Sequence, residues 1–199
     1  FKYSNGEGFL KGLFIREAKR TGEVMVNLTT SDHLPQNFQK QIKQFAEEFE
    51  NLEVDGRRIT TLYWSKVISK RGFRREVKET LLFGKEFLTE KMILKNGDEL
   101  FFDIAPQAFF QVNSLQAEKL YGKVLELAIV KKHEVALDLF CGTGTIGLFL
   151  AKHVGELVGV ELNADAVKTA RKNAEKNSIS NAEFFLGDVG RVLPELKKK

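Results

Sequence analysis

Residues 136–147 read ALDLFCGTGTIG, so an apolar segment leads without interruption into a glycine-rich turn. The apolar residues predict a buried strand at 135–140, and a helical pattern follows at 146–153. Glycine lets the backbone turn tightly and lets a ligand approach where a Cβ would otherwise stand. The first N–H groups of the helix have no partner within it and attract anions. The segment therefore predicts a strand–turn–helix unit that binds a nucleotide-like ligand.

Two classes of ligand fit this loop. Gly142, Gly144 and Gly147 spell G-x-G-x-x-G, the pattern of dinucleotide-binding proteins. Asp138 followed by Gly142 and Gly144 also matches the loop of Rossmann-like methyltransferases. There the acidic residue and the loop backbone contact the methionine end of S-adenosylmethionine. A tight turn without a ligand is the third interpretation, and the strand and helix patterns on either side argue against it.

Two acidic residues follow the next two strands that the pattern predicts. Glu161 ends a strand at 156–161, where a carboxylate can accept hydrogen bonds from both hydroxyls of a ribose. Asp188 follows Gly187 after a strand at 182–186, and in methyltransferases this position can meet the adenine amino group. Capping of the segment that follows explains Asp188 equally well. Neither acid separates NAD from S-adenosylmethionine, because both ligands carry the ribose.

The alternation of strands with helices predicts an α/β fold with a parallel sheet in the second half of the chain. Helices are expected at 146–153 and 163–177, and an earlier one runs from the cap residue Asn113 to about Ala128, with Gln116 at the capping-box position. The first half predicts a smaller α+β domain. Its elements are a hairpin from 9–16 and 23–30, a helix at 36–51, and strands at 59–64, 80–83 and 99–104.

Composition excludes several classes of protein. The single cysteine, Cys141, excludes an internal disulfide framework and a multi-cysteine metal site, and no metal is expected. No run of about 18 apolar residues is present, so no membrane partner is expected. The 31 basic and 27 acidic residues of the 199 give a net charge of +4, which permits an anionic partner without requiring one.

The segment APQAFFQVN at 105–113, together with DLFCGTG at 138–144, resembles the RNA uracil-C5 methyltransferase family. This resemblance implies a Rossmann-like methyltransferase fold, limited here to its first three strand–helix units at 105–199 and preceded by a central α+β domain at 1–104. It also implies S-adenosylmethionine as the cofactor. Residues implied to bind it are Gln111, Asp138, Phe140, Gly142, Gly144, Thr145 and Glu161, with Asn163 and Asp188 as further candidates.

The chain departs from this family where the chemistry takes place. The family reaction needs a cysteine that adds to C6 of uracil and a glutamate that later removes the C5 proton. Both follow the later strands of the family's sheet, and neither motif occurs here. Cys141 lies in the cofactor loop, where a small residue is needed, so we interpret it as a buried filler. The chain therefore reads as an inactive fragment with no catalytic residue, and its first parallel strand is expected to form an exposed apolar edge.

A basic segment in the first half predicts contacts with RNA. Residues 65–78 carry six cations against the single acid Glu76, and Trp64 and Phe73 are interleaved with them. Such a segment can grip phosphates and stack on an unpaired base, although a solvated hairpin loop explains the pattern as well. The candidate RNA-binding residues are Lys66, Lys70, Arg71, Arg74 and Arg75.

The sequence thus predicts part of a cytoplasmic, S-adenosylmethionine-dependent methyltransferase that modifies C5 of a uridine in ribosomal or transfer RNA. Three alternatives remain open. An NAD-dependent oxidoreductase explains the glycines and Glu161, but not the segment at 109–113. A methyltransferase with another substrate fits the loop equally well. A non-catalytic RNA-binding module would depend on residues 64–78 alone.

Overall fold

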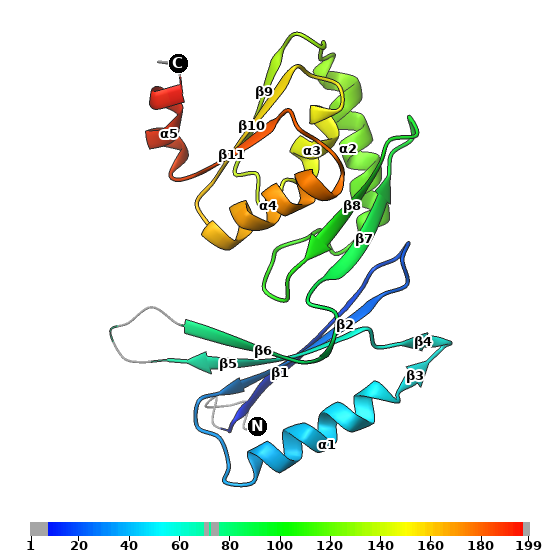
Figure 1. Cartoon of the computed structure of the whole chain (residues 1–199), viewed down its shortest axis with the longest axis vertical. Helices are drawn as coiled ribbons and strands as arrows, with labels where there is room; N and C mark the ends of the chain where they lie inside the picture. The colour runs from blue at the N-terminus through cyan, green and yellow to red at the C-terminus, as the bar shows by residue number, and fades with distance from the viewer. Residues whose placement is uncertain (1–7, 70–71, 73–75, 197–199) are drawn as a thin grey trace. The chain divides into compact units, whose positions relative to one another are not determined.

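The computed structural model describes residues 8–69, 72 and 76–196. Its contacts divide the chain into two compact units, residues 1–88 and 89–199 (Figure 1). The sequence predicted a division between residues 104 and 105. The structure instead assigns the strand at 99–104 to the second unit, because that strand is hydrogen-bonded to a helix of the second unit.

The first unit is an α+β structure built on a four-stranded sheet with the order β1-β2-β5-β6. Strands β2 and β5 pair in parallel, and the outer pairs β1–β2 and β5–β6 are antiparallel. Helix α1 connects the two parallel strands, and β3 and β4 form a separate small ribbon. The elements are β1 (Leu10–Glu17), β2 (Val24–Ser31), α1 (Phe38–Glu50), β3 (Glu53–Val54), β4 (Arg57–Arg58), β5 (Thr61–Ile68) and β6 (Glu76–Gly84).

Helix α1 packs on the sheet through aromatic side chains at its start. Phe38 is buried and lies edge-on to Phe9, with ring centroids 6.0 Å apart. Its ring is also 4.8 Å from that of Trp64 on β5. The indole Nε1 of Trp64 donates a hydrogen bond to Thr30 on β2. The spacing of apolar residues that predicted a helix at 36–51 is thus the face of α1 that meets the sheet.

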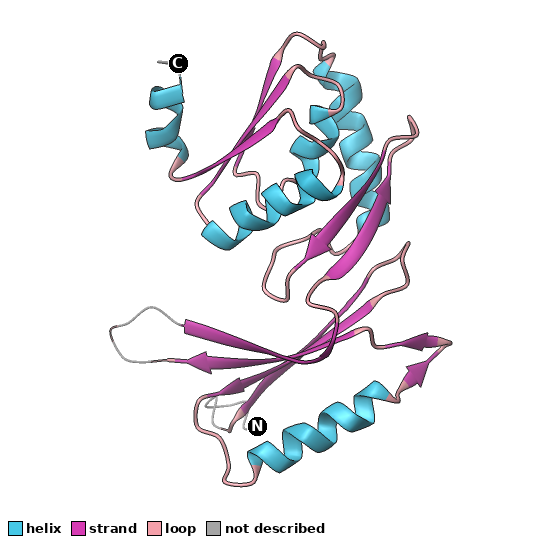
Figure 2. Ribbon diagram, in the orientation of Figure 1, coloured by secondary structure: helices cyan, strands magenta, loops and turns pink. Residues whose placement is uncertain are grey.

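The second unit contains a parallel three-stranded sheet with the order β11-β10-β9, together with helices and the two-stranded sheet β7-β8 (Figure 2). This confirms the predicted α/β fold and its three strand–helix units. The elements are β7 (Leu88–Ile93), β8 (Glu99–Ile104), α2 (Ser114–Ala128), β9 (Val135–Leu139), α3 (Thr145–Ala151), β10 (Glu156–Glu161), α4 (Ala164–Lys176), β11 (Ala182–Leu186) and α5 (Val189–Leu196).

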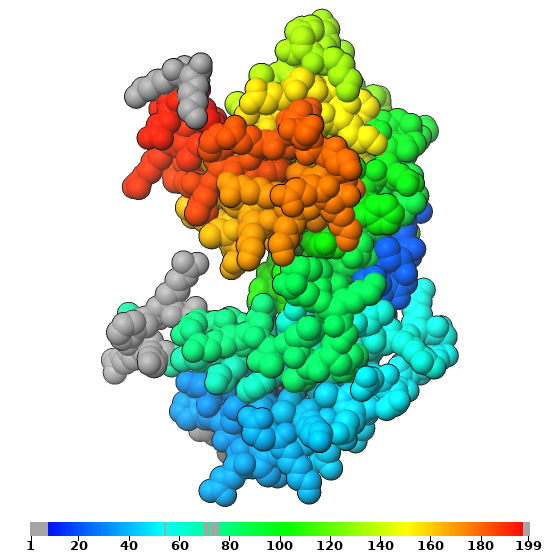
Figure 3. Space-filling model, viewed as in Figure 1, coloured from blue at the N-terminus to red at the C-terminus, as the bar shows by residue number. Residues whose placement is uncertain are grey.

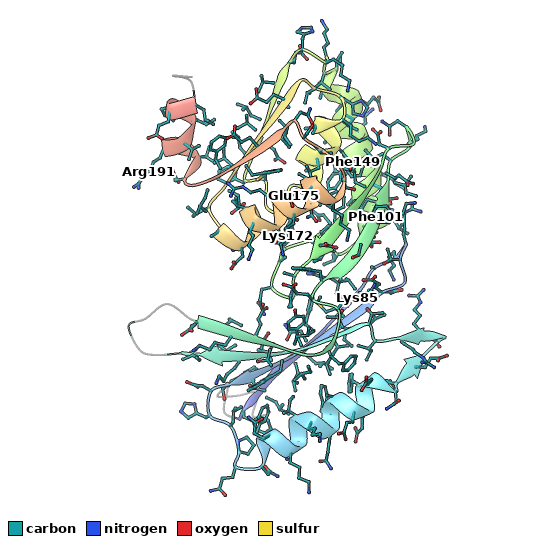
Figure 4. The ribbon with its side chains drawn as sticks, viewed as in Figure 1. Lys85, Phe101, Phe149, Lys172, Glu175 and Arg191 are labelled. Carbon is teal, nitrogen blue, oxygen red and sulfur yellow. The ribbon has the colours of Figure 1, made fainter. Side chains whose placement is uncertain are left out.

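Helices α3 and α4 share one face of the parallel sheet. Asp138 on β9, Gly159 on β10 and Phe184 on β11 stand in register and so point to the same side. On that side Asp138 meets α3, and Phe184 lies near Ala170 of α4. The core continues through Phe149 of α3, whose ring contacts Phe102 of β8 and lies among the elements of this unit (Figure 4).

Strand β9 lies at one edge of this sheet, as the sequence predicted for the first parallel strand. Its residues Val135, Leu137 and Leu139 point away from the helix-covered face, and the Leu137 side chain is 52% exposed. Parallel strands with such apolar sequences are normally covered on both faces. In the described part of the chain this side of β9 is open.

Helix α2 begins as predicted. The side chain of Asn113 accepts a hydrogen bond from the backbone N–H of Gln116 at 3.1 Å, which satisfies one of the unpaired donors of the first turn. Tyr121 and Ala117 form part of its buried face. Across the described residues, no helix is both long and apolar enough to cross a membrane.

Candidate cofactor-binding site

The loop between β9 and α3 has an alternating backbone conformation. Phe140, Gly142 and Gly144 have φ angles of 64°, 55° and 81°. Glycine adopts this left-handed region freely, but for phenylalanine it costs about 1 kcal/mol or more. The Phe140 side chain is nevertheless 75% exposed, so its own burial offsets little of that cost. An aromatic ring held at the surface by a strained backbone is typical of a binding site.

The end of β10 holds this loop in place. The N–H groups of Phe140 and Cys141 both donate to the carbonyl oxygen of Val160, at 2.8 and 3.1 Å. One residue further, Gly142 N–H donates to Glu161 Oε2 at 3.0 Å, and Asn163 N–H donates to Glu161 Oε1 at 2.8 Å. Both carboxylate oxygens are therefore oriented from the backbone, beside the glycine turn.

Asp138 on β9 forms a hydrogen bond with the backbone of the first turn of α3. Its Oδ2 accepts a hydrogen bond from Gly147 N–H at 2.9 Å. Burial raises the pKa of Asp138, and the hydrogen bond from Gly147 opposes that rise. A Cβ at position 147 would lie 2.6 Å from the same oxygen. The third glycine of the G-x-G-x-x-G pattern is thus required by the packing of α3 on Asp138.

Tyr121 is a functional candidate that the sequence reasoning missed. Its ring is buried on α2, against Phe149. Burial raises the pKa of Tyr121, whereas hydrogen bonds with the side chains of Thr145 and Gln111 lower it, and the charge of Asp138 raises it. Tyr121 therefore connects two predicted cofactor-binding residues. The available signal was a tyrosine on the buried face of a helix, where its hydroxyl needs a partner.

The remaining predicted residues divide into two groups. Glu161 and Asp188 lie at the same edge of the sheet as the glycine loop, because parallel strands end together, and Gly187 N–H donates to the Glu161 carbonyl at 2.9 Å. Asn163 is a helix cap, since its Oδ1 accepts from Asp165 N–H at 2.9 Å and from the next N–H. Its side chain is thus explained by the start of α4 alone.

Cys141 is poorly suited to act as a nucleophile. The residue is 7% exposed, and its sulfur packs against Gly159 of β10. A Cβ added to Gly159 would lie 3.0 Å from that sulfur. Burial raises the pKa of Cys141 to about 12, and the charges of Asp138 and Glu161 add to the rise. Because the thiolate is the reactive form, the thiol is inert near neutral pH. Among the described residues, no group of His, Cys, Asp and Glu gathers to hold a metal ion.

The candidate RNA-binding residues are only partly described. Lys66 lies on β5 with its ammonium 5.8 Å from the centroid of the Trp64 ring. The Trp64 ring packs against Phe38, and its indole N–H donates a hydrogen bond to Thr30. Trp64 therefore belongs to the packing of α1 and is not a free stacking platform. The other four candidates, Lys70, Arg71, Arg74 and Arg75, lie outside the described residues.

Comparisons with known proteins show which proteins this chain resembles. A family model described as a methyltransferase domain matches residues 130–199. An uncharacterized RNA methyltransferase of Clostridium tetani is 35% identical over 193 residues, which are 97% of this chain and 40% of that protein. An uncharacterized RNA methyltransferase of Protochlamydia amoebophila is 38% identical over 200 residues, covering 96% of this chain and 45% of that protein.

Nearly the whole chain also resembles a solved structure. It is the Pyrococcus abyssi tRNA (uracil-54, C5)-methyltransferase in complex with S-adenosyl-L-homocysteine, with a TM-score of 0.68 at 33% identity. The match covers 93% of this chain and 41% of that one, so the chain spans less than half the length of these relatives. The chain therefore has a Rossmann-like fold, matches a methyltransferase domain at residues 130–199 and resembles RNA methyltransferases over nearly its whole length.

Proposed function

We propose that this chain binds S-adenosylmethionine through the glycine loop and the acidic residues at the adjoining strand ends. The arrangement of Glu161 carries the proposal. Its two oxygens are held by the N–H groups of Gly142 and Asn163, which leaves lone pairs on the same oxygens for the two hydroxyls of a ribose. The cofactor would thus lie across the loop, with its ribose at the end of β10.

The observations favour S-adenosylmethionine over NAD. The third glycine of the dinucleotide pattern has a packing reason of its own, since Gly147 must approach Asp138. The pattern therefore does not require a pyrophosphate. The solved relative with a TM-score of 0.68 was crystallised with S-adenosyl-L-homocysteine. When bound, the cofactor supplies an electrophilic methyl group on a positively charged sulfur.

The residues of the chain bind and orient this cofactor at its two ends. Phe140 offers an exposed ring beside the loop, and Asp188 stands after β11 for the adenine. On the other side of the loop, Gln111 and Thr145 meet at the Tyr121 hydroxyl, close to Asp138. These polar groups suit the amino-acid end of the cofactor. Its ammonium and carboxylate need partners of both kinds.

We further propose that the acceptor is C5 of a uridine in ribosomal or transfer RNA, and that the protein acts in the cytoplasm. The resemblance to RNA methyltransferases over 97% of the chain supports RNA as the substrate class. Residues 1–88 would contribute to RNA binding through Lys66 and the basic segment that follows it. Neutralising Arg74 and Arg75 together is expected to weaken RNA binding in a gel-shift assay and to leave cofactor binding unchanged.

In this proposal the 199-residue chain binds cofactor but does not methylate RNA. The uracil reaction needs a thiolate, and the chain's single thiol, Cys141, is buried with a pKa of about 12. A methyl-transfer assay with labelled cofactor and an RNA transcript is therefore expected to give no incorporation above background. Any incorporation would contradict this proposal, and incorporation that is lost in Cys141→Ala would make Cys141 the nucleophile.

Isothermal titration calorimetry tests the cofactor proposal directly. The chain is titrated with S-adenosylhomocysteine and, separately, with NAD. Glu161→Ala removes the proposed ribose contact, and Glu175→Ala is the control, because Glu175 lies on the outer side of α4 (Figure 4). The homocysteine compound is expected to bind, and Glu161→Ala to weaken it by about tenfold or more, whereas Glu175→Ala leaves it unchanged. Preferential binding of NAD would overturn the proposal.

A further inference from the structure

Two asparagines one turn apart, Asn173 of α4 and its C-cap residue Asn177, point toward the backbone of β8. Asn173 is fully buried, and a buried amide must find hydrogen-bond partners. Its Oδ1 accepts from Asp103 N–H at 2.8 Å. Asn177 Oδ1 accepts from Phe101 N–H, also at 2.8 Å. The opposite, outer side of α4 carries Lys172 and Glu175 and is exposed (Figures 3 and 4).

The repeat follows from the geometry of the two elements. Four residues of helix rise about 6 Å, and two residues of strand extend about 6.6 Å. Asparagines at i and i+4 therefore match alternate N–H groups along β8. An ion pair between Lys176 and Asp103 reinforces the same contact. Both asparagines thus share one structural task, the attachment of β8 to α4.

Only Asn173 also contacts the cofactor loop. Its Nδ2 donates to the carbonyl oxygen of Thr143 at 3.2 Å. The corresponding Nδ2 of Asn177 donates to the carbonyl oxygens of Phe101 and Asn173, within the β8–α4 contact. Of the two amides, Asn177 is half-buried and bonds only within the β8–α4 contact, whereas Asn173 is fully buried and bonds to the glycine loop.

This bond fixes one particular peptide group of the loop. The Thr143 carbonyl and the Gly144 N–H belong to the same peptide plane. Asn173 holds the carbonyl, and Gly144 N–H donates to the Cys141 carbonyl at 2.9 Å. Glycines flank Thr143 on both sides with positive φ angles, so the local backbone would otherwise rotate easily. Held at both ends, the plane has one orientation.

We propose that Asn173 is a positioning residue for the cofactor loop, and that it keeps the loop in its binding conformation before a ligand arrives. The inference rests on the proposed function of the loop. A loop that is already ordered loses less conformational entropy on binding, so loss of the Asn173 bond weakens affinity without removing any ligand contact. Asn173 acts on the ligand through Thr143 and does not itself touch it.

The test compares Asn173→Asp with Asn177→Asp. Each substitution keeps an acceptor for β8, removes the amide donor and introduces one carboxylate. We expect S-adenosylhomocysteine to bind Asn173→Asp about tenfold more weakly and Asn177→Asp about as well as the parent. If Asn173→Asp does not fold, Asn173→Ser replaces it, since serine carries no charge and is shorter than the distance it would have to bridge.

An NMR readout that needs no ligand separates this inference from the proposed function. In ¹⁵N–¹H spectra, the amide signals of Gly142 and Gly144 are expected to shift or broaden in the Asn173 variant and to stay in place in the Asn177 variant. If the parent chain binds no S-adenosylhomocysteine, the proposed function fails, and these signals still test the ordering of the loop. Unchanged glycine signals in a folded Asn173 variant would overturn the inference.

Discussion

The backbone N–H of Gly147 donates to Asp138 Oδ2 at 2.9 Å, and a Cβ at position 147 would lie only 2.6 Å from that oxygen. The hydrogen bond brings the first turn of α3 onto the end of β9. That contact sets where the glycine loop between them can lie. Gly147, which belongs to a sequence motif for ligand binding, therefore sets the position of the loop through its packing on Asp138.

Gly147→Ala is expected to destabilise the chain. The new Cβ would meet Asp138 Oδ2 and also Leu157 Cδ2, at 2.9 Å, so α3 would have to move away from β9. We expect a loss of about 1–3 kcal/mol, as for other overpacked core positions. Chemical denaturation followed by circular dichroism measures it.

Gly122→Ala is the matched control for that substitution. Gly122 lies within α2, and nothing is within 4 Å of the Cβ that alanine would add. Alanine is better than glycine in a helix interior, so this variant should gain about 0.5–1 kcal/mol. Equal effects of the two substitutions would contradict the argument from packing.

Replacement of Phe140 is expected to weaken cofactor binding without a loss of stability. Its φ of 64° is costly for phenylalanine, and its ring is 75% exposed. Asparagine adopts the left-handed region more readily, so Phe140→Asn is expected to keep or raise the free energy of unfolding, by up to about 1 kcal/mol. The same change removes the aromatic surface beside the loop and should weaken S-adenosylhomocysteine in calorimetry. A large loss of stability would mean that the ring contributes to the core.

Tyr121 is expected to affect cofactor binding more than folding. Tyr121→Phe keeps the ring against Phe149 but removes the hydroxyl that meets Thr145 and Gln111. We predict affinity for S-adenosylhomocysteine that is lower by about threefold to tenfold. Adenosine, which lacks the amino-acid end, should bind the variant and the parent equally.

Tyr63→Phe provides the control for the loss of a tyrosine hydroxyl. The Tyr63 hydroxyl donates to the Glu86 carbonyl at 2.9 Å within the first unit, whereas the glycine loop belongs to the second unit. Its removal should cost about 1 kcal/mol of stability and leave both affinities unchanged. If Tyr121→Phe behaves in the same way, Tyr121 has only a structural role.

The sequence predicted those parts of the fold and site that depend on local pattern. Apolar strand patterns predicted β9, β10 and β11 with bounds that are within one residue of the observed strands. The cap residue Asn113 was predicted because its partner, Gln116, is three residues away. Glu161 was singled out because it ends the next predicted strand, and the structure places its carboxylate beside the loop.

The parts that were missed depend on contacts between elements distant in sequence. Asn173 lies within the helix predicted at 163–177 but was not singled out, because only the folded chain brings it to Asp103 and Thr143. Strand β7 was missed although its burial alternates, because Glu90 is a charged residue at a buried position. The same long-range contacts move the division of the chain from residue 104 to residue 88.

The buried thiol of Cys141 is expected to make the stability of the chain depend on pH in the alkaline range. Burial raises the pKa of its thiol from 9.0 to about 12 in the folded chain. Between these values the unfolded chain releases the proton and the folded chain retains it, so stability is present below pH 9 and falls as the pH rises toward 12. Urea unfolding at pH 8 and at pH 10 should show a larger loss of unfolding free energy for the parent than for Cys141→Ala, in which the lysines and tyrosines still titrate.

Reaction of the folded parent with iodoacetamide at pH 8 should also be much slower than reaction of the unfolded chain. Fast alkylation of the folded protein would show instead that the thiol is ionised, and Cys141 would have to be reconsidered as a nucleophile.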